Sequence, residues 1–270
     1  MLQRDPIMKL MVAAIQSSPR FGEVAANVAA ALELVPRGCE LCVLPELFST
    51  GYQFLGRDEL RALSEPVPDG PTTARLRAFA AERGTCLVAG LAERAGERLF
   101  NTALLVRPNG STEIYRKVHL FWNEKGLFDP GDLGFAVHEA AGTHIGMMVC
   151  FDWIFPEAAR TLALAGALVL CHPSNLVLPL CPDAMVTRAV ENRVFALTAN
   201  RVGVEHRSDA ELRFIGLSQV VAPSGRRLAA LGEGETGAAV ASIDLAQART
   251  PVTPRNDVWA DRRPDVYRLG

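Results

Sequence analysis

The sequence lacks an excess of positive charge, a dense cysteine framework and an apolar run long enough to cross a membrane. Its 28 basic side chains face 30 acidic ones, which argues against a nucleic-acid partner because phosphate binding needs a basic surface. Six cysteines in 270 residues are too few for a disulfide scaffold and indicate a reducing, cytoplasmic environment. The segment from Ile7 to Ile15 contains a lysine and is too short for a bilayer, so no membrane association is expected.

Apolar residues are abundant, at 49% of the chain, while charged residues make up 21%. A chain of this length and composition can fill a large core, so a globular protein is expected. No internal repeat or low-complexity linker is present, and we therefore predict one domain over residues 1–270. Residues 1–7 precede a second methionine and are interpreted as an upstream start or a leader. Residues from about 250 to 270 are rich in proline and arginine and are interpreted as a tail on a surface or a partner subunit.

Strand-length apolar runs alternate with helix-period segments along most of the chain, which is typical of α/β proteins. The expected strands are 10–16, 41–44, 86–90, 101–106, 112–119, 144–149, 167–171, 196–199, 214–221 and 238–243, and the expected helices begin near residues 24, 71, 156 and 183. Turn residues at 108–110 join two of these strands as a hairpin, so the sheet is predicted to be mixed. Residues 121–132 break the pattern, and a loop of this length often has a functional role.

Three reactive side chains lie at or near the ends of strand-like segments: Glu46, Lys117 and Cys150. Ligand sites in α/β proteins collect at such strand ends. A thiol, whose ordinary pKa is about 8.5, needs a base or a positive field to become a good nucleophile. A buried carboxylate can take the thiol proton, and an ammonium group can stabilise the anion formed by attack on a carbonyl or nitrile carbon. These three residue types therefore suffice for acyl transfer to water.

Histidine is the alternative base. His144 lies six positions before Cys150, roughly 20 Å along an extended strand, and is out of reach. His119 and His172 stay open as candidates because their distance in the sequence says nothing about their distance in the fold.

A glutamate, lysine or cysteine at a strand end, taken singly, is more often an ordinary surface or core side chain than a catalytic one. This applies to Glu46, Lys117 and Cys150. Cys39 and Cys42 have a Cys-x-x-Cys spacing that also occurs in zinc and redox sites. Cys42 lies in an apolar run, so a core role is favoured and no metal is predicted. No glycine-rich phosphate loop follows a strand, so nucleotide binding is not supported.

The phrases around the three reactive residues resemble the diagnostic motifs of the nitrilase superfamily, the carbon-nitrogen hydrolases. They read Leu44-Pro45-Glu46-Leu47, Tyr115-Arg116-Lys117-Val118-His119 and Cys150-Phe151-Asp152-Trp153-Ile154-Phe155-Pro156-Glu157. The likeness continues through Pro130-Gly131-Asp132, His172-Pro173-Ser174-Asn175 and residues 188–193, and covers the chain from about residue 8 to the tail. It implies a four-layer α-β-β-α sandwich with mixed sheets, which pairs into homodimers or larger assemblies and requires no cofactor.

The resemblance also implies a role for each residue. Cys150 is the nucleophile, Glu46 is the general base and later the general acid, and Lys117 is the cation at the oxyanion. The backbone N–H of Phe151 is the second oxyanion donor. Glu124 matches a second glutamate that orients the substrate in many amidases, and the alternative is a loop charge paired with Lys125 or Arg116. The residues expected to line the substrate pocket are Asn175, Trp122 and Tyr52.

Phe151 and Asp152 follow the cysteine where true nitrilases tend to carry Trp-Glu. The resemblance therefore favours hydrolysis of a small non-peptide amide or carbamoyl amine through a cysteine thioester, with release of ammonia or an amine. An aliphatic nitrilase is the alternative, because some archaeal members described as nitrilases carry a similar phrase. A catalytically idle binding or scaffold member of the same fold is a hypothesis from another class. The expected partner is a small amide or nitrile substrate.

Overall fold

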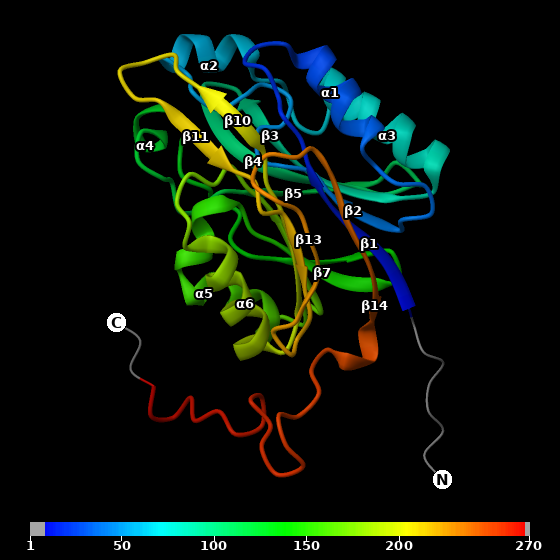
Figure 1. Cartoon of the computed structure of the whole chain (residues 1–270). Coiled ribbons are helices and arrows are strands. Elements are labelled where there is room, and N and C mark those ends of the chain that lie inside the picture. Colours follow the sequence, from blue (N-terminus) through cyan, green and yellow to red (C-terminus); the bar gives the residue numbers. More distant parts are fainter. Residues whose placement is uncertain (1–8, 268–270) are drawn as a thin grey trace.

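The chain forms two packed β-sheets with helices on both outer faces (Figure 1). The computed structural model describes residues 9–267, so the predicted leader lies outside the described residues. Helices α1 (Val24–Glu33) and α3 (Pro71–Arg83) cover one sheet, and α5 (Pro156–Leu164) and α6 (Cys181–Asn192) cover the other. The predicted four-layer α-β-β-α sandwich is confirmed.

The first sheet has six strands in the order β14-β1-β2-β3-β4-β5. Its strands are β1 (Lys9–Gln16), β2 (Leu41–Val43), β3 (Cys86–Ala95), β4 (Arg98–Val106), β5 (Thr112–Arg116) and β14 (Gly237–Asp244). Strands β1, β2 and β3 are parallel, whereas β4, β5 and β14 pair antiparallel to their neighbours. The sheet is therefore mixed, as the hairpin signal predicted.

The second sheet has six strands in the order β13-β12-β9-β8-β7-β6. Its strands are β6 (Val137–Ala140), β7 (Thr143–Met147), β8 (Val169–Pro173), β9 (Phe195–Ala199), β12 (Gln219–Val221) and β13 (Arg227–Ala230). The remaining elements are α2 (Arg57–Leu63), α4 (Glu124–Leu127), the two-stranded pair β10 (Val202–Glu205) and β11 (Leu212–Ile215), and 3-10 turns at Cys150–Ile154 and Leu245–Gln247. In each sheet the central strands are parallel, so their carboxyl ends meet at one edge.

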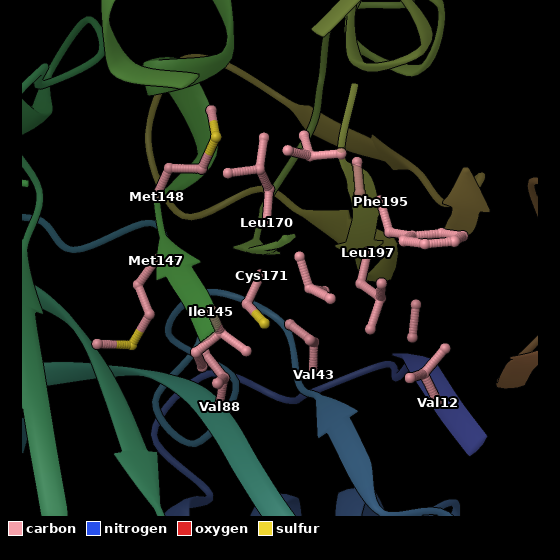
Figure 2. Packing of buried hydrophobic residues seen from close by; sticks show 14 of the residues in the cluster. Val12, Val43, Val88, Ile145, Met147, Met148, Leu170, Cys171, Phe195 and Leu197 are labelled. Carbon is pink, nitrogen blue, oxygen red and sulfur yellow. The ribbon is translucent and has the colours of Figure 1, made fainter. Parts of the chain in front are cut away.

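The core between the sheets explains why the strands read as unbroken apolar runs. Val12 and Val43 of the first sheet face Ile145 and Leu197 of the second (Figure 2). The intervening residues of the same strands point the other way, toward α1 and α3, as Ala13 does. Because both faces of each central strand are covered, apolar residues occupy nearly every position rather than every second one.

The predicted strand 214–221 is wrong, because the segment divides into β11 and β12. Leu217, between them, has a φ of +61°, which extended strands exclude. β11 turns away from the second sheet and pairs with β10 instead. Helix α2 and the strands β6, β10 and β13 were not predicted from the sequence, and residues 121–132, predicted as a loop, contain α4.

Candidate active site

Glu46 follows β2 and lies against the backbone of β3. A Cβ atom at Gly90 would come within 2.4 Å of the Cα of Glu46, so only glycine permits this approach. The N–H of Gly90 donates to the carbonyl of Pro45 at 3.1 Å, and the N–H of Phe48 donates to the carbonyl of Gly90 at 3.2 Å. Backbone contacts on both sides of the glutamate therefore set its position.

Lys117 follows β5 directly and is held in the same way. Its N–H donates to the carbonyl of Asn101 at 2.8 Å, and its carbonyl accepts from the N–H of Gly131 at 2.9 Å. A Cβ at Gly131 would lie 2.0 Å from the carbonyl oxygen of Arg116, so this turn also requires glycine. The Pro-Gly turn of the 121–132 segment thus supports the lysine.

Cys150 lies three residues beyond β7, at the start of a 3-10 turn, with a φ of +42°. This backbone conformation is uncommon for a residue with a side chain and often occurs at functional sites. The buried Asp152 carboxylate accepts from the N–H of Val149 at 2.8 Å and from the Tyr115 hydroxyl at 2.7 Å. On the other side, Nε2 of His172 donates to the carbonyl of Cys150 at 2.9 Å. These bonds hold the strained turn that presents the thiol.

The two histidines left open as bases have other partners. Nδ1 of His119 lies 2.7 Å from Oδ1 of Asp152. Burial lowers the pKa of His172 to about 4, so at neutral pH its ring is uncharged and its Nε2–H is committed to the backbone of Cys150. Within residues 9–267, the thiol makes one hydrogen bond, to the carbonyl of Asn175 at 3.8 Å. A carboxylate is therefore the better candidate base.

A buried cluster of charges lies beside the thiol. Nζ of Lys117 is 2.8 Å from Oε1 of Glu46 and 2.8 Å from Oε1 of Glu124. The side-chain amide of Asn101 donates to the same Glu46 oxygen at 2.7 Å, and the Tyr52 hydroxyl donates to Oε1 of Glu124 at 2.8 Å. Glu124 is buried at the start of α4 and pairs with Lys117, so the alternative of a loop charge paired with Lys125 or Arg116 is wrong.

The environment shifts the pKa values of this cluster in directions that suit proton transfer. Burial raises the pKa of the Glu46 carboxyl, although the Lys117 ammonium opposes the rise. Burial alone would lower the pKa of Lys117, but Glu124 and Glu46 outweigh it, so the pKa is raised and the group stays charged. Burial also raises the pKa of the Cys150 thiol, Glu46 adds to the rise and Lys117 opposes it. The thiol is consequently protonated at rest and needs a base.

Two hollows are lined by neighbouring residues, one by Phe121 and the other by Trp122. The first is lined by Cys150, Phe121, Phe151, Trp153, Asn175, Leu176, Val177 and Leu178. The second is lined by Tyr52, Gln53, Phe54, Trp122, Asn123, Glu124, Leu127, Phe128 and Leu212. Among the described residues, no hydrogen-bond partner reaches the side-chain oxygen or nitrogen of Asn175, which is 3% exposed. Trp122, which lines the second hollow, is 50% exposed.

Cys39 and Cys42 are buried in the core under α1 and α3. Residues 9–267 contain no group of three or more His, Cys, Asp or Glu side chains arranged to hold a metal ion. None of the helices in that part of the chain is long and apolar enough to cross a bilayer.

Comparison with known proteins identifies the family. The carbon-nitrogen hydrolase family profile matches residues 11–250. The chain belongs to the carbon-nitrogen hydrolases of the nitrilase superfamily. It is 44% identical over 261 residues to a nitrilase of Pyrococcus abyssi, which covers 95% of this chain and 98% of that protein. It is 32% identical over 272 residues to N-carbamoylputrescine amidase of Solanum lycopersicum, covering 92% of this chain and 90% of that protein.

A solved structure of this family is similar throughout. It is a mutant of the amidase from Nesterenkonia sp. in which the acetamide moiety of fluoroacetamide is covalently added at the active-site cysteine. It superposes with a TM-score of 0.77 at 29% identity, and the match covers 95% of this chain and 94% of that one.

Sequence reasoning missed Asn101 as a member of the site and treated it only as a strand residue. One signal was available, because Asn101 and Thr102 are polar residues inside the otherwise apolar β4. A fully buried polar side chain needs a partner, and here the partner of Asn101 is Glu46.

Proposed function

We propose that this carbon-nitrogen hydrolase cleaves a small non-peptide amide or carbamoyl amine through a thioester on Cys150. The observation that carries the proposal is the buried Lys117 ammonium between the carboxylates of Glu46 and Glu124, beside a strained cysteine. A protonated buried thiol, a carboxyl with a raised pKa and a permanent cation form a complete set for nucleophilic acyl transfer.

In the first half-reaction Glu46 takes the thiol proton and the sulfur attacks the carbonyl carbon. Oε1 of Glu46 already accepts two hydrogen bonds, from Lys117 and Asn101, so Oε2 receives the proton. The Lys117 ammonium, held between the two carboxylates, stabilises the developing oxyanion together with the N–H of Phe151. Glu46 then returns the proton to the nitrogen, the C–N bond breaks and ammonia or an amine leaves.

In the second half-reaction water hydrolyses the thioester. Glu46 takes a proton from the water, the resulting oxygen nucleophile attacks the thioester carbon, and Lys117 again stabilises the oxyanion. The C–S bond breaks, the acid is released and the sulfur regains its proton. Glu124, held by Tyr52 and by the N–H of Phe121 at 3.0 Å, orients Lys117 and the substrate throughout.

An amide fits the polar groups of this site better than a nitrile does. Among the described residues, Oε2 of Glu46 and Oδ1 of Asn175 are buried acceptors that no protein donor reaches. An amide nitrogen carries N–H donors for such acceptors, whereas a nitrile nitrogen only accepts. The apolar side chains around Cys150, including Phe121 and Trp153, suit a short uncharged acyl group.

The relatives support both the amide proposal and one alternative. The similar Nesterenkonia amidase carries an acetamide moiety on its active-site cysteine, which is consistent with Cys150 as nucleophile. The 44% identical relative is named a nitrilase, and this similarity keeps aliphatic nitriles as the second candidate substrate class.

Ammonia release from short aliphatic amides, carbamoyl amines and aliphatic nitriles tests the proposal. We expect turnover of amides or carbamoyl amines, and loss of at least about 10⁴-fold in kcat for Cys150→Ala. Cys181→Ala is the matched control, because Cys181 is also a buried free cysteine but begins α6 rather than lining the hollow. Turnover of nitriles alone would favour the second candidate, and an unchanged rate in Cys150→Ala would exclude the mechanism. A binding or scaffold role predicts no turnover of any of the three classes.

A further inference from the structure

A second buried charge pair lies behind the proposed active site. Arg201 and Glu205, at the two ends of the β10 segment, form an ion pair whose side chains are 1% and 5% exposed. Burial of two charges is costly unless their hydrogen bonds are satisfied. The Arg201 guanidinium also donates to the carbonyl of Pro19 at 2.9 Å. The reaction steps described above use neither residue.

The Glu205 carboxylate binds the backbone of the segment that carries Tyr52. It accepts from the N–H of Tyr52 at 3.1 Å and from the N–H of Gln53 at 2.6 Å. Glu205 is 153 residues away from Tyr52 in the sequence, so only the fold brings them together. Charge-assisted bonds of this type are stronger than neutral ones and fix the backbone that they reach.

The arginine of the pair reaches the Tyr52 ring by a second route. Its guanidinium lies over the ring of Phe214, 4.0 Å from the centroid. Phe214 in turn contacts Tyr52 edge to face, with ring centroids 5.9 Å apart. The pair thus holds Tyr52 by its backbone through Glu205 and by its ring through Phe214.

Tyr52 connects this ion pair to the charge cluster of Lys117, Glu46 and Glu124. Its hydroxyl donates to Oε1 of Glu124, the same oxygen that accepts from Nζ of Lys117. Without the phenol donor, that oxygen attracts the ammonium more strongly and draws it away from the thiol. Burial raises the pKa of Cys150 and the Lys117 ammonium opposes the rise, so a shift of this ammonium changes how readily the thiolate forms.

We propose that Glu205, paired with Arg201, is a positioning residue that sets Tyr52 against Glu124 and thereby tunes the reactivity of Cys150. The inference rests on the proposed function, because it assumes that Cys150 is the nucleophile. It extends that function by assigning a positioning role to a residue of β10 that does not line the hollow around Cys150.

Alkylation of Cys150 by iodoacetamide, followed by mass spectrometry of its peptide, tests this without a known substrate. We expect the rate to fall about tenfold in Glu205→Gln and about tenfold in Tyr52→Phe, each relative to the unmodified protein. The double variant is expected to stay near a tenfold loss, because both changes break the same connection. Where a substrate is found, kcat/KM should follow the same pattern.

Glu59→Gln is the matched control. Glu59 also pairs with an arginine, Arg207, at 2.7 Å, but within residues 9–267 it makes no hydrogen bond to Tyr52. Its alkylation rate should equal that of the unmodified protein. Where Glu205→Gln fails to fold, Glu205→Asp keeps the charge, withdraws the acceptor by one methylene and should show the same loss.

Three results would overturn the inference: an unchanged rate in the folded Glu205 variant, an unchanged rate in Tyr52→Phe, or a double variant whose loss is the product of the two single losses. A merely structural role of Glu205 lowers the melting temperature and leaves the rate at low temperature unchanged. Failure of the proposed function is separate, because it shows as absent turnover of every substrate class while the alkylation rates can still be compared.

Discussion

Lys117 and Glu46 form a buried ion pair in which Nζ lies 2.8 Å from Oε1, and both side chains are fully removed from solvent. A second carboxylate, Glu124, lies at the same distance from the ammonium. Burial raises the pKa of the Glu46 carboxyl, the Lys117 ammonium opposes this rise and the Glu124 carboxylate adds to it. The reactivity of the site therefore depends on the balance of three buried charges.

Glu46→Gln removes the base without changing its shape. We expect kcat to fall by about 10² to 10⁴-fold, which is the usual contribution of a general base. Only the ionised form of Glu46 is a base, so in the unmodified protein the rate should rise as this carboxyl loses its proton with increasing pH. Burial raises its pKa, so the rise should occur above pH 4.5, the ordinary pKa of glutamic acid. The measurement is kcat/KM against pH. The control is Glu113→Gln, at a half-exposed carboxylate of β5, which should keep both the rate and its pH dependence. If the rise with pH is still present in Glu46→Gln, another group causes it and the prediction is wrong.

His172 should make stability depend on pH. Its ordinary pKa is 6.5 and its pKa in the folded protein is about 4, so between these values the unfolded chain binds a proton that the folded protein does not. The free energy of unfolding therefore decreases as the pH falls from 6.5 toward 4, by up to about 3 kcal/mol. His172→Gln should flatten this dependence in urea denaturation at several pH values. His144→Gln, at a half-exposed ring, should not, and equal slopes in both variants would contradict the prediction.

Asp152→Asn should loosen the turn that presents the thiol. The buried carboxylate accepts from Val149, Tyr115 and His119, and an amide offers one acceptor oxygen instead of two. We expect the free energy of unfolding to fall by about 2 to 3 kcal/mol and the alkylation rate of Cys150 to fall with it. Denaturation curves measure the first effect. Asp183→Asn, at a carboxylate that is 86% exposed, should change neither quantity, and wild-type stability in Asp152→Asn would refute the role of the carboxylate.

Asn175→Leu should separate stability from activity. The side-chain oxygen and nitrogen of Asn175 are buried without partners among the described residues, an arrangement that destabilises a fold and is retained at functional sites. Leucine has a similar size and removes this cost, so we expect stability to rise by about 1 kcal/mol while KM for an amide increases. Thermal melting and initial-rate kinetics measure the two effects. A lower melting temperature with unchanged KM would show that Asn175 is a structural residue.

The α/β class and the three reactive positions could be predicted because they depend on local sequence, whereas the four-layer sandwich was implied by the family resemblance. The apolar runs of β1, β2 and β8 identify strands covered on both faces, and the residues that follow such strands gather at one sheet edge in any parallel arrangement. The segment around Leu217 could not be predicted, because its sequence is compatible with a strand and only the pairing of β11 with β10 decides that the chain turns there.

The sequence by itself determined the residue types that carry the chemistry, since a thiol, a carboxylate and an ammonium suffice for acyl transfer wherever the chain brings them together. Only the tertiary structure decided which side chains support them. Asn101 lies 55 residues from Glu46, Tyr52 lies 72 residues from Glu124, and Glu205 lies 153 residues from Tyr52. Contacts over such distances depend on sheet register and backbone packing, and no local pattern records them.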